Sequence, residues 1–245
     1  GELLSPKHIS DIGYLPEERG LYKSMKVGEQ ALYLAQLKGL SKTEAKKRLK
    51  HWFEKFDIAD WWDKKIEELS KGMAQKIQFI VTVLHEPKLL IFDEPFSGFD
   101  PINAKLIADE ILKLRDNGAT IIFSTHRMES VEEMCDEIAL INKSNKILEG
   151  KLTDIKKQYR TNTFQVGLHT TSPKEVKTAL HENFKVSPPD FKLLGNELTL
   201  NVTLSENQSA NDLLSFLIDK GNVQHFVELI PSANDIFIQA VNKNN

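Results

Sequence analysis

The chain has 245 residues, 40% of them hydrophobic and 27% charged, which is an ordinary composition for one large globular domain or two modest ones. Its formal net charge of -3 disfavours nucleic acid as a main partner, because proteins that bind nucleic acid usually carry clustered positive charge. The single cysteine, Cys135, excludes an internal disulfide framework and is typical of a reducing compartment.

The N-terminal part of the chain predicts one short strand followed by helices. HISDIGYLP, residues 8–16, is expected to form a strand that ends at its proline. Val27–Leu37 carries apolar side chains at helical spacing. Ser41 and Glu44 have the pattern of a capping box, which predicts the start of a basic helix. Residues 26–70 are therefore expected to be mostly helical and to form a helical insert.

The middle of the chain alternates helices with buried strands. Residues 71–85 predict a helix that is apolar on most sides. KLLIFDEP (88–95) and ATIIFSTH (119–126) are apolar runs that predict strands buried on both faces, as in a parallel sheet. Between these two strands, Asp100 followed by Pro101 predicts the start of a helix. This order of elements indicates an α/β layer domain.

The C-terminal part follows a different order. After a predicted hairpin, EIALINKSNKILEG, residues 162–230 alternate as β-α-β-β-α-β, the order of a ferredoxin-like unit. Within it, Ser172 and Glu175 form a second capping-box pattern. Gly195-Asn196 predicts the turn of a second hairpin.

This change of pattern predicts two domains. We expect residues 1–155 to form the α/β domain, with a helical subdomain at about residues 26–75, and residues 156–245 to form a small α+β domain. The histidines of the second domain are scattered and lack the spacing of metal ligands. We therefore expect an accessory, dimerising or regulatory role for the second domain.

Two carboxylates end the first buried strand of the α/β domain. Asp93 and Glu94 follow LLIF, and ligands of open α/β sheets bind at the carboxyl ends of the strands. Because neighbouring strand residues point to opposite sides, one carboxylate can hold a divalent cation while the other addresses a water molecule. The alternative for this pair alone is a strand end with solvated acids.

His126 ends the second buried strand, within STHR. It is therefore expected near Asp93 and Glu94 at the same edge of the sheet. A histidine there can donate a hydrogen bond to a phosphate oxygen or accept one from water. A structural role is the alternative.

Two helix starts complete the set of motifs. In LSKGM, Ser70 is a predicted N-cap, Lys71 adds positive charge and Gly72 permits close approach, which together suit an anion. In SGFDP, Asp100 is the predicted N-cap of the next helix. The alternative for LSKGM is a helix cap and nothing more, and SGFDP taken alone is better explained as a plain helix cap.

In this fixed order, the motifs resemble the nucleotide-binding subunits of ABC transporters. LSKGM resembles the signature sequence of that family, LLIFDEP its Walker B strand with the adjoining glutamate, SGFD its D-loop and STH its switch-histidine loop. IGYLPEE resembles the loop that joins the catalytic core to the helical insert. The resemblance covers roughly residues 8–155. It implies a P-loop NTPase-like parallel-sheet core, here incomplete, and some exporter ATPases have a similar small C-terminal extension.

The resemblance also implies roles and cofactors. With ATP and Mg²⁺ as cofactors, Asp93 would help to hold the metal, Glu94 would be the general base for the attacking water, and His126 would contact the γ-phosphate. Ser70, Lys71 and Gly72 would contact a nucleotide held by a second ATPase subunit in a head-to-tail dimer. Asp100 would lie at the interface of that dimer.

The sequence departs from the family pattern in three places. Lys71 and Met73 replace the first glycine and the glutamine of the usual L-S-G-G-Q, so we expect altered contacts to the phosphate and altered coupling, with function kept. Glu17 stands where the connecting loop usually carries a glutamine, and it is a candidate contact for the metal and the nucleotide. No G-x-x-x-x-G-K-[ST], the loop that cradles phosphates, occurs in the chain. We expect that loop in a longer protein, before Ile12, and expect this chain alone to bind and hydrolyse ATP poorly.

Together these features predict the ATP-hydrolysing subunit of an exporter. The apolar stretches are too short to span a bilayer and the first residues do not resemble a signal peptide. The expected place is therefore the cytoplasm, at the inner face of the membrane, bound to a separate membrane-spanning permease. The alternatives are a soluble ABC-type ATPase that acts on ribosomes or DNA, and a non-hydrolysing regulatory module. The transported substrate is not predicted.

Overall fold

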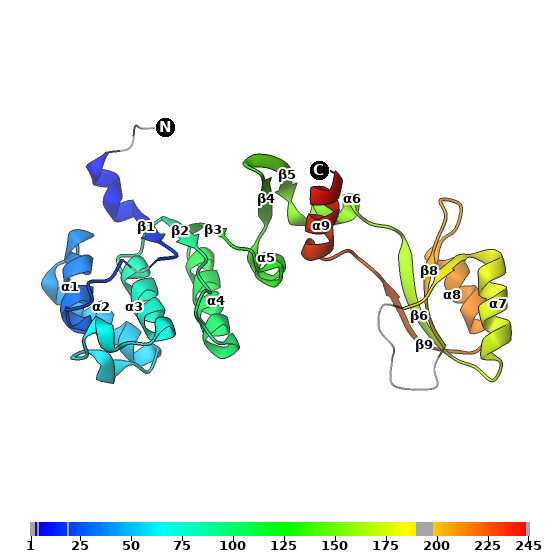
Figure 1. Ribbon diagram of the computed structural model, residues 1–245, viewed down its shortest axis with the longest axis horizontal. Coiled ribbons are helices and arrows are strands. Elements are labelled where there is room, and N and C mark those ends of the chain that lie inside the picture. The colour runs from blue at the N-terminus through cyan, green and yellow to red at the C-terminus, as the bar shows by residue number, and fades with distance from the viewer. Residues whose placement is uncertain (1–2, 4, 19, 190–197, 244–245) are drawn as a thin grey trace. The chain divides into compact units, whose positions relative to one another are not determined.

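The structure is a computed structural model that describes residues 3, 5–18, 20–189 and 198–243. Its contacts divide the chain into two compact units, Gly1–Arg127 and Met128–Asn245. Figure 1 shows both units and labels most of their helices and strands. Among the described residues, no helix combines the length and the apolar character that crossing a bilayer requires.

The first unit combines a small parallel sheet with helices. Its elements are the 3-10 helix η1 (Pro6–Asp11), β1 (Ile12–Leu15), α1 (Val27–Leu37), α2 (Lys42–Lys55), the 3-10 helices η2 (Ala59–Trp61) and η3 (Ile66–Glu68), α3 (Lys71–Val83), β2 (Leu89–Asp93), α4 (Pro101–Asp116) and β3 (Thr120–Ser124). The predicted helical insert and the predicted order of strands and helices are confirmed. The α/β fold class is confirmed as well.

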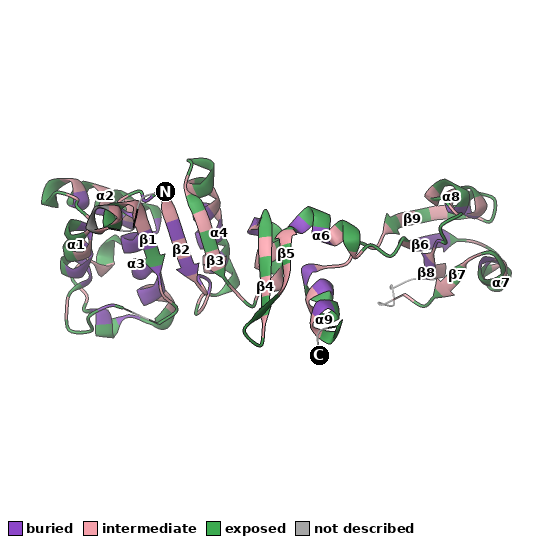
Figure 2. Ribbon diagram, turned by 90° about the horizontal axis from the view of Figure 1, so that it is seen from above, coloured by how far each residue is buried: buried purple, intermediate pink, exposed green. Residues whose placement is uncertain are grey.

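The sheet of the first unit runs in the order β1-β2-β3, with all neighbours parallel. Leu90 and Phe92 of β2 are buried on one face, where Phe79 of α3 packs on Phe92 with a ring separation of 6.0 Å. On the other face Tyr14 and Ile122 are 55% and 56% exposed. The strands predicted at 88–95 and 119–126 are both present, but the predicted burial on both faces is wrong for each. Helices of the described residues cover only one face of the sheet (Figure 2).

The strand predicted at residues 8–16 is shorter than expected. Pro6–Asp11 form a 3-10 helix, and only Ile12–Leu15 pair in the sheet. Pro6 at the first helical position has a backbone preset for a turn, and the backbone N–H of Ser5 donates to Nδ1 of His8 at 3.0 Å. Local turn chemistry therefore overrides the strand pattern in this segment.

The helical insert forms as predicted, with one difference at a cap. Ser41 Oγ accepts a hydrogen bond from the backbone N–H of Glu44 at 3.2 Å. The Glu44 carboxylate instead accepts from Arg48 Nε at 2.7 Å. Only half of the predicted capping box is therefore formed, because an arginine one turn further on competes for the carboxylate.

The second unit begins with a helix and a hairpin. Its elements are α5 (Met128–Met134), β4 (Glu137–Asn142), β5 (Asn145–Lys151), α6 (Leu152–Gln158), β6 (Thr163–His169), α7 (Pro173–Asn183), β7 (Lys185–Ser187), β8 (Leu198–Thr203), α8 (Ala210–Ile218), β9 (Asn222–Glu228) and α9 (Ala233–Lys243). Lys143 and Ser144, between β4 and β5, have φ angles of 47° and 62°, as a two-residue type I′ turn requires. The predicted first hairpin is confirmed.

The ferredoxin-like order is confirmed as a four-stranded antiparallel sheet, β7-β8-β6-β9, with a core shared with α7 and α8. The second capping box is wrong: Ser172 makes no side-chain cap bond, and its backbone has φ -125° and ψ 62°, away from the extended geometry of a cap. The turn predicted at Gly195-Asn196 lies outside the described residues.

The last helix, α9, contacts α5 and β5 of its own unit. Oε1 of Glu132 on α5 accepts from the backbone N–H of Ala233 at 2.6 Å and from Lys156 Nζ at 2.8 Å. One carboxylate thus ties α9 to α5 and α6. The division at residues 155 and 156 stays a prediction.

Candidate functional site

Asp93 and Ser124 end neighbouring parallel strands and are register partners. The hydroxyl of Ser124 donates to Oδ1 of Asp93. The second carboxylate oxygen of Asp93 takes no hydrogen bond from a described residue. Asp93 is therefore a fixed carboxylate at the carboxyl edge of the sheet, as its strand predicted.

Glu94 reaches from the end of β2 to the loop that follows β3. Its Oε1 accepts from the backbone N–H of His126 at 3.0 Å and lies 2.7 Å from Nδ1 of the same residue. Its Oε2 accepts from Oγ1 of Thr125 at 3.3 Å. The Glu94 side chain is 15% exposed, whereas that of His126 is 84% exposed. The structure thus brings Asp93, Glu94 and His126 together, with a largely covered carboxylate and an open imidazole.

The backbone of Glu94 is in an unusual conformation. Its φ of 45° lies in the left-handed region, which costs a residue with a side chain about 1–3 kcal/mol in strain. The backbone N–H of Glu94 donates to the Ser124 carbonyl at 3.1 Å, and its own carbonyl accepts from the N–H of Ser97 at 3.0 Å. These bonds hold the strained residue so that its carboxylate leaves the line of the strand. Strain held in this way is typical of functional positions.

An aromatic layer supports the loops of this edge. Phe96 is 3% exposed and meets Phe123 of β3 edge-to-face at 6.3 Å. The guanidinium of Arg127 lies over the ring of Phe96, 5.9 Å from its centroid. The segments after β2 and β3 are therefore packed on each other.

The LSKGM segment lies against the loop that follows Glu94. Ser70 caps α3 by accepting from the backbone N–H of Met73 at 3.3 Å, as predicted. Lys71 Nζ donates to Ser97 Oγ at 3.2 Å. The Lys71 stem covers Gly98, whose φ of 83° favours glycine, and a Cβ added there would lie 2.9 Å from the Lys71 side chain. A Cβ on Gly72 would lie 3.0 Å from the Gly98 carbonyl. Sequence reasoning did not predict this contact between the two segments.

Asp100 is an N-cap, as predicted. Its carboxylate accepts from the backbone N–H of Asn103 at 3.0 Å. Hydrogen bonds from the Asn103 backbone, and then from its side chain, hold the pKa of Asp100 below its ordinary value. The side chain is exposed and therefore ionised at neutral pH.

Glu17 is not brought to the other predicted residues. Its exposed carboxylate has no hydrogen-bond or ion-pair partner in the part of the chain that the structure describes. The loop around it is instead held by Gln78 of α3, whose Nε2 donates to the carbonyls of Pro16 and Glu18, both at 3.4 Å. Gln78 is thus a residue that the sequence analysis missed.

The donor set suits magnesium better than a fully protein-bound metal. No group of three or more His, Cys, Asp or Glu side chains among the described residues is placed to hold a metal ion. Mg²⁺, however, commonly takes one or two carboxylates, with water and substrate phosphates as its other ligands. The fixed carboxylate of Asp93, with one oxygen left without a partner among the described residues, fits that kind of site.

Sequence reasoning also missed three hydroxyl groups. Ser97, Ser124 and Thr125 contact Lys71, Asp93 and Glu94 respectively. Ser124 and Thr125 directly precede His126, so their place at the strand end was a usable signal. The contact of Ser97 depends on how two loops pack, which no local pattern encodes.

Comparison with known families gives two matches. The family described as "ABC transporter" matches residues 5–97. The family described as "ATP-binding protein DrrA1-3-like, C-terminal domain" matches residues 150–241. The first match covers β1, β2 and the helical insert between them but ends before β3, and the second covers the C-terminal part.

Individual relatives agree. The ABC transporter ATP-binding protein YhaQ of Bacillus subtilis (strain 168) is 43% identical over 96% of this chain and 76% of its own. The linearmycin resistance ATP-binding protein LnrL of the same organism is 35% identical over 59% of this chain and 46% of its own. A solved structure titled "Structure of ATP binding subunit of ABC transporter" superimposes with a TM-score of 0.59 at 30% identity, over 63% of this chain and 64% of that one.

Proposed function

Because this chain belongs to the ABC transporter ATP-binding proteins, we propose that it is the subunit that hydrolyses ATP to power export through a separate membrane-spanning permease. Export is favoured by the small C-terminal extension and by similarity to a protein named for linearmycin resistance. The identity of the exported substrate is not part of the proposal, because its binding site would lie in the permease.

The observation that carries the proposal is the contact between Glu94 and His126 beside Asp93. In the proposed reaction a carboxylate oxygen of Glu94 takes a proton from the attacking water. His126, whose ring is exposed, donates to the γ-phosphate. The hydrogen bonds from the His126 backbone and Thr125 orient the Glu94 carboxylate.

Asp93 would hold Mg²⁺, and Glu17 would approach it from the connecting loop. When bound, Mg²⁺ supplies positive charge that stabilises the phosphoryl oxygens. The fixed position of Asp93 follows from the hydrogen bond that Ser124 donates to it. Glu17 would have to move to take this part, since it contacts none of the other candidates among the described residues.

The start of α3 is proposed as a second nucleotide contact. Ser70, Lys71 and Gly72 would face the γ-phosphate of an ATP held by a second subunit in a head-to-tail dimer, with Asp100 at the interface. Backbone N–H groups at a helix start favour an anion, and Lys71 adds a cation. Because Lys71 contacts Ser97, binding of a nucleotide at the start of α3 would change the contacts of the loop that follows Glu94.

We place the protein in the cytoplasm, at the inner face of the membrane, with residues 26–70 toward the permease. The 245 residues contain no phosphate-binding loop sequence, so the proposal includes that this chain alone binds and hydrolyses ATP poorly. Tests of activity therefore use the complete protein.

The test is the substitution Glu94→Gln in the complete protein. It keeps a hydrogen-bond acceptor but removes the base, so turnover is expected to fall by about 100-fold or more while ATP and Mg²⁺ bind. An ATP-bound dimer is then expected to accumulate, as measured by gel filtration with ATP. The matched control is Glu29→Gln, which makes the same change on the exposed surface of α1. Unchanged turnover in Glu94→Gln would remove Glu94 as the base.

A further inference from the structure

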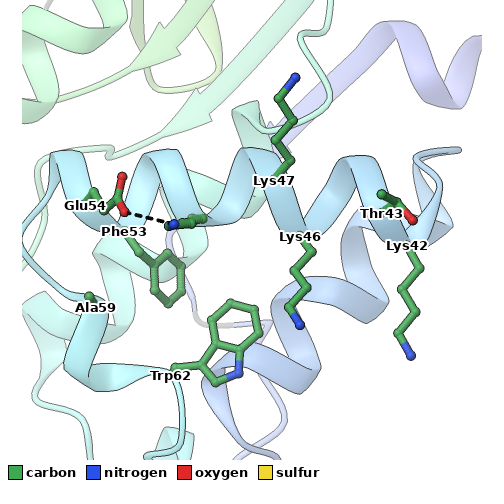
Figure 3. Close-up of a pocket in the computed structure, with 9 residues that line it drawn as sticks. Lys42, Thr43, Lys46, Lys47, Phe53, Glu54, Ala59 and Trp62 are labelled. Atoms are coloured by element: carbon green, nitrogen blue, oxygen red, sulfur yellow. Dashed lines mark ion pairs between the residues drawn. The ribbon is translucent and has the colours of Figure 1, made fainter.

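A separate pocket lies in the helical insert of the first unit. It has a volume of about 730 Å³ and is bounded by one side of α2 and by the segment that follows it. Its lining residues are Lys42, Thr43, Lys46, Lys47, Lys50, Phe53, Glu54, Ala59 and Trp62. None of them belongs to the candidate site for ATP. Figure 3 shows Phe53 and Trp62 together at its floor.

The floor of the pocket is apolar and firmly built. The rings of Phe53 and Trp62 meet edge-to-face at 5.5 Å. Trp62 also lies directly on Gly28 of α1, where an added Cβ would come within 2.3 Å of the indole. The Gly28 N–H donates to the Trp62 carbonyl at 3.0 Å. The floor is thus preformed, as ligand pockets usually are.

One rim of the pocket is basic. Lys42, Lys46 and Lys50 follow each other at four-residue intervals and so share a side of α2. Lys42 and Lys46 have no ion-pair partner within the part of the chain that the structure describes, and Figure 3 shows both extending to the same side of the helix as the apolar floor. Lys50 pairs with Glu54 only at 3.8 Å, and both side chains are exposed. Lysines outnumber the single glutamate among the lining residues, so the rim has a net positive charge.

We propose that this pocket binds an amphiphilic organic anion, with its apolar body on Phe53 and Trp62 and its carboxylate or phosphate beside Lys42 and Lys46. Apolar surface and positive charge lie on different sides of one pocket, and a molecule with one apolar and one anionic end matches that division. The volume lies within the range of roughly 300–1,000 Å³ that is usual for small-molecule sites. A ligand of this kind would bind to the helical insert while the ATP site remains free.

The test uses the 245-residue chain and a matched pair of probes. Dodecanoate and dodecanol have the same alkyl chain, but only dodecanoate carries a charge at neutral pH. Binding is measured by calorimetry and by tryptophan fluorescence, below the micelle concentration. We expect saturable one-to-one binding of dodecanoate, at least about ten-fold tighter than that of dodecanol.

Two variants test the two halves of the pocket. Lys42→Glu with Lys46→Glu reverses the charge of the rim and is expected to weaken dodecanoate binding by at least about ten-fold. Ala59→Trp fills the pocket from an exposed position, so it tests the apolar half without disturbing the core. The Ala59→Trp variant is expected to lose dodecanoate binding while its thermal unfolding stays unchanged. The control, Lys174→Glu with Lys177→Glu on α7, makes the same change of charge elsewhere and should leave binding within about two-fold.

Three results would overturn the proposal. The first is equal affinity for dodecanoate and dodecanol, which would leave no role for the lysines. The second is dodecanoate binding that survives both the charge reversal and Ala59→Trp. The third is binding of an acidic amphipathic peptide without binding of dodecanoate, which would make the pocket a docking site for protein. Turnover of ATP enters none of these results, so failure here leaves the proposed function untouched.

Discussion

The Glu94 carboxylate contacts His126, in the loop that follows β3, at two points: the backbone N–H at 3.0 Å and Nδ1 at 2.7 Å. The position of the histidine loop therefore depends on the side chain of Glu94. Removing the charge of Glu94 and removing its hold on the loop are therefore separable effects, and different substitutions at this position test each.

Glu94→Ala is expected to loosen the loop after β3, whereas Glu94→Gln is expected to keep it. The glutamine carbonyl oxygen can still accept from the His126 N–H, and alanine cannot. Loss of one such bond is worth about 1 kcal/mol, or roughly five-fold in opening of the loop. Amide hydrogen exchange at residues 124–127 of the chain measures this. Equal exchange in the two variants would contradict the role of the carboxylate as the anchor.

Glu110 of α4 is a buried carboxylate that joins α4 to the helical insert. It is 3% exposed and pairs with Lys55 of α2 and, at 2.7 Å, with Lys113. Burial by itself raises the pKa of Glu110, but hydrogen bonds from Lys113 and Lys55 outweigh it and leave the pKa below the ordinary 4.5. The folded chain therefore stabilises the ionised form of Glu110 relative to the unfolded chain.

Glu110→Gln is expected to lower the free energy of unfolding at pH 7 by about 2 kcal/mol, because it leaves Lys55 without its charged partner. A carboxyl group whose pKa is lower in the folded than in the unfolded chain stabilises the fold at a pH above its unfolded-state pKa. That stabilisation is lost as the pH falls through its folded-state pKa. The difference between wild type and variant should thus shrink below pH 4.5. Urea unfolding at pH 7 and pH 3.5 measures it. Asp109→Asn, which breaks an exposed pair with Lys105, is the control and should cost less than about 1 kcal/mol.

Gly28→Ala is expected to destabilise the helical insert. The new Cβ would lie 2.3 Å from Trp62, and overpacking of this kind costs about 1–3 kcal/mol. The control is Gly20→Ala, since no atom lies within 4 Å of a Cβ added there. Thermal unfolding compares the two variants, and similar midpoints would show that Trp62 moves aside at no cost.

Cys135 is expected to be an unreactive thiol. Burial, with a smaller effect of the Asp136 charge, raises the pKa of Cys135 from 9.0 to about 11. Because the thiolate is the reactive form, alkylation at pH 8 should be about 100-fold slower in the folded chain than in urea. The rate of iodoacetamide labelling checks this, and labelling at the same rate in both conditions would be inconsistent with a half-buried thiol of raised pKa.

The elements were predictable where the pattern is local and strong. The apolar run before Asp93, the cap at Asp100 and the helical spacing of Val27–Leu37 each depend on neighbours in the sequence, and each is confirmed. Where a prediction was wrong, either tertiary packing or a competing local interaction was the cause. Ser172 has the residue type of a cap but the wrong backbone angles.

By itself, the sequence determined the class of fold and placed Asp93, Glu94 and His126 at one edge, because the carboxyl ends of neighbouring parallel strands must meet there. Only the tertiary structure decided which side chains touch: that Glu94 turns to the His126 backbone, that Lys71 reaches Ser97, and that Glu17 stays apart. Those contacts depend on backbone angles and loop packing between segments distant in the chain, and no spacing of residue types records them.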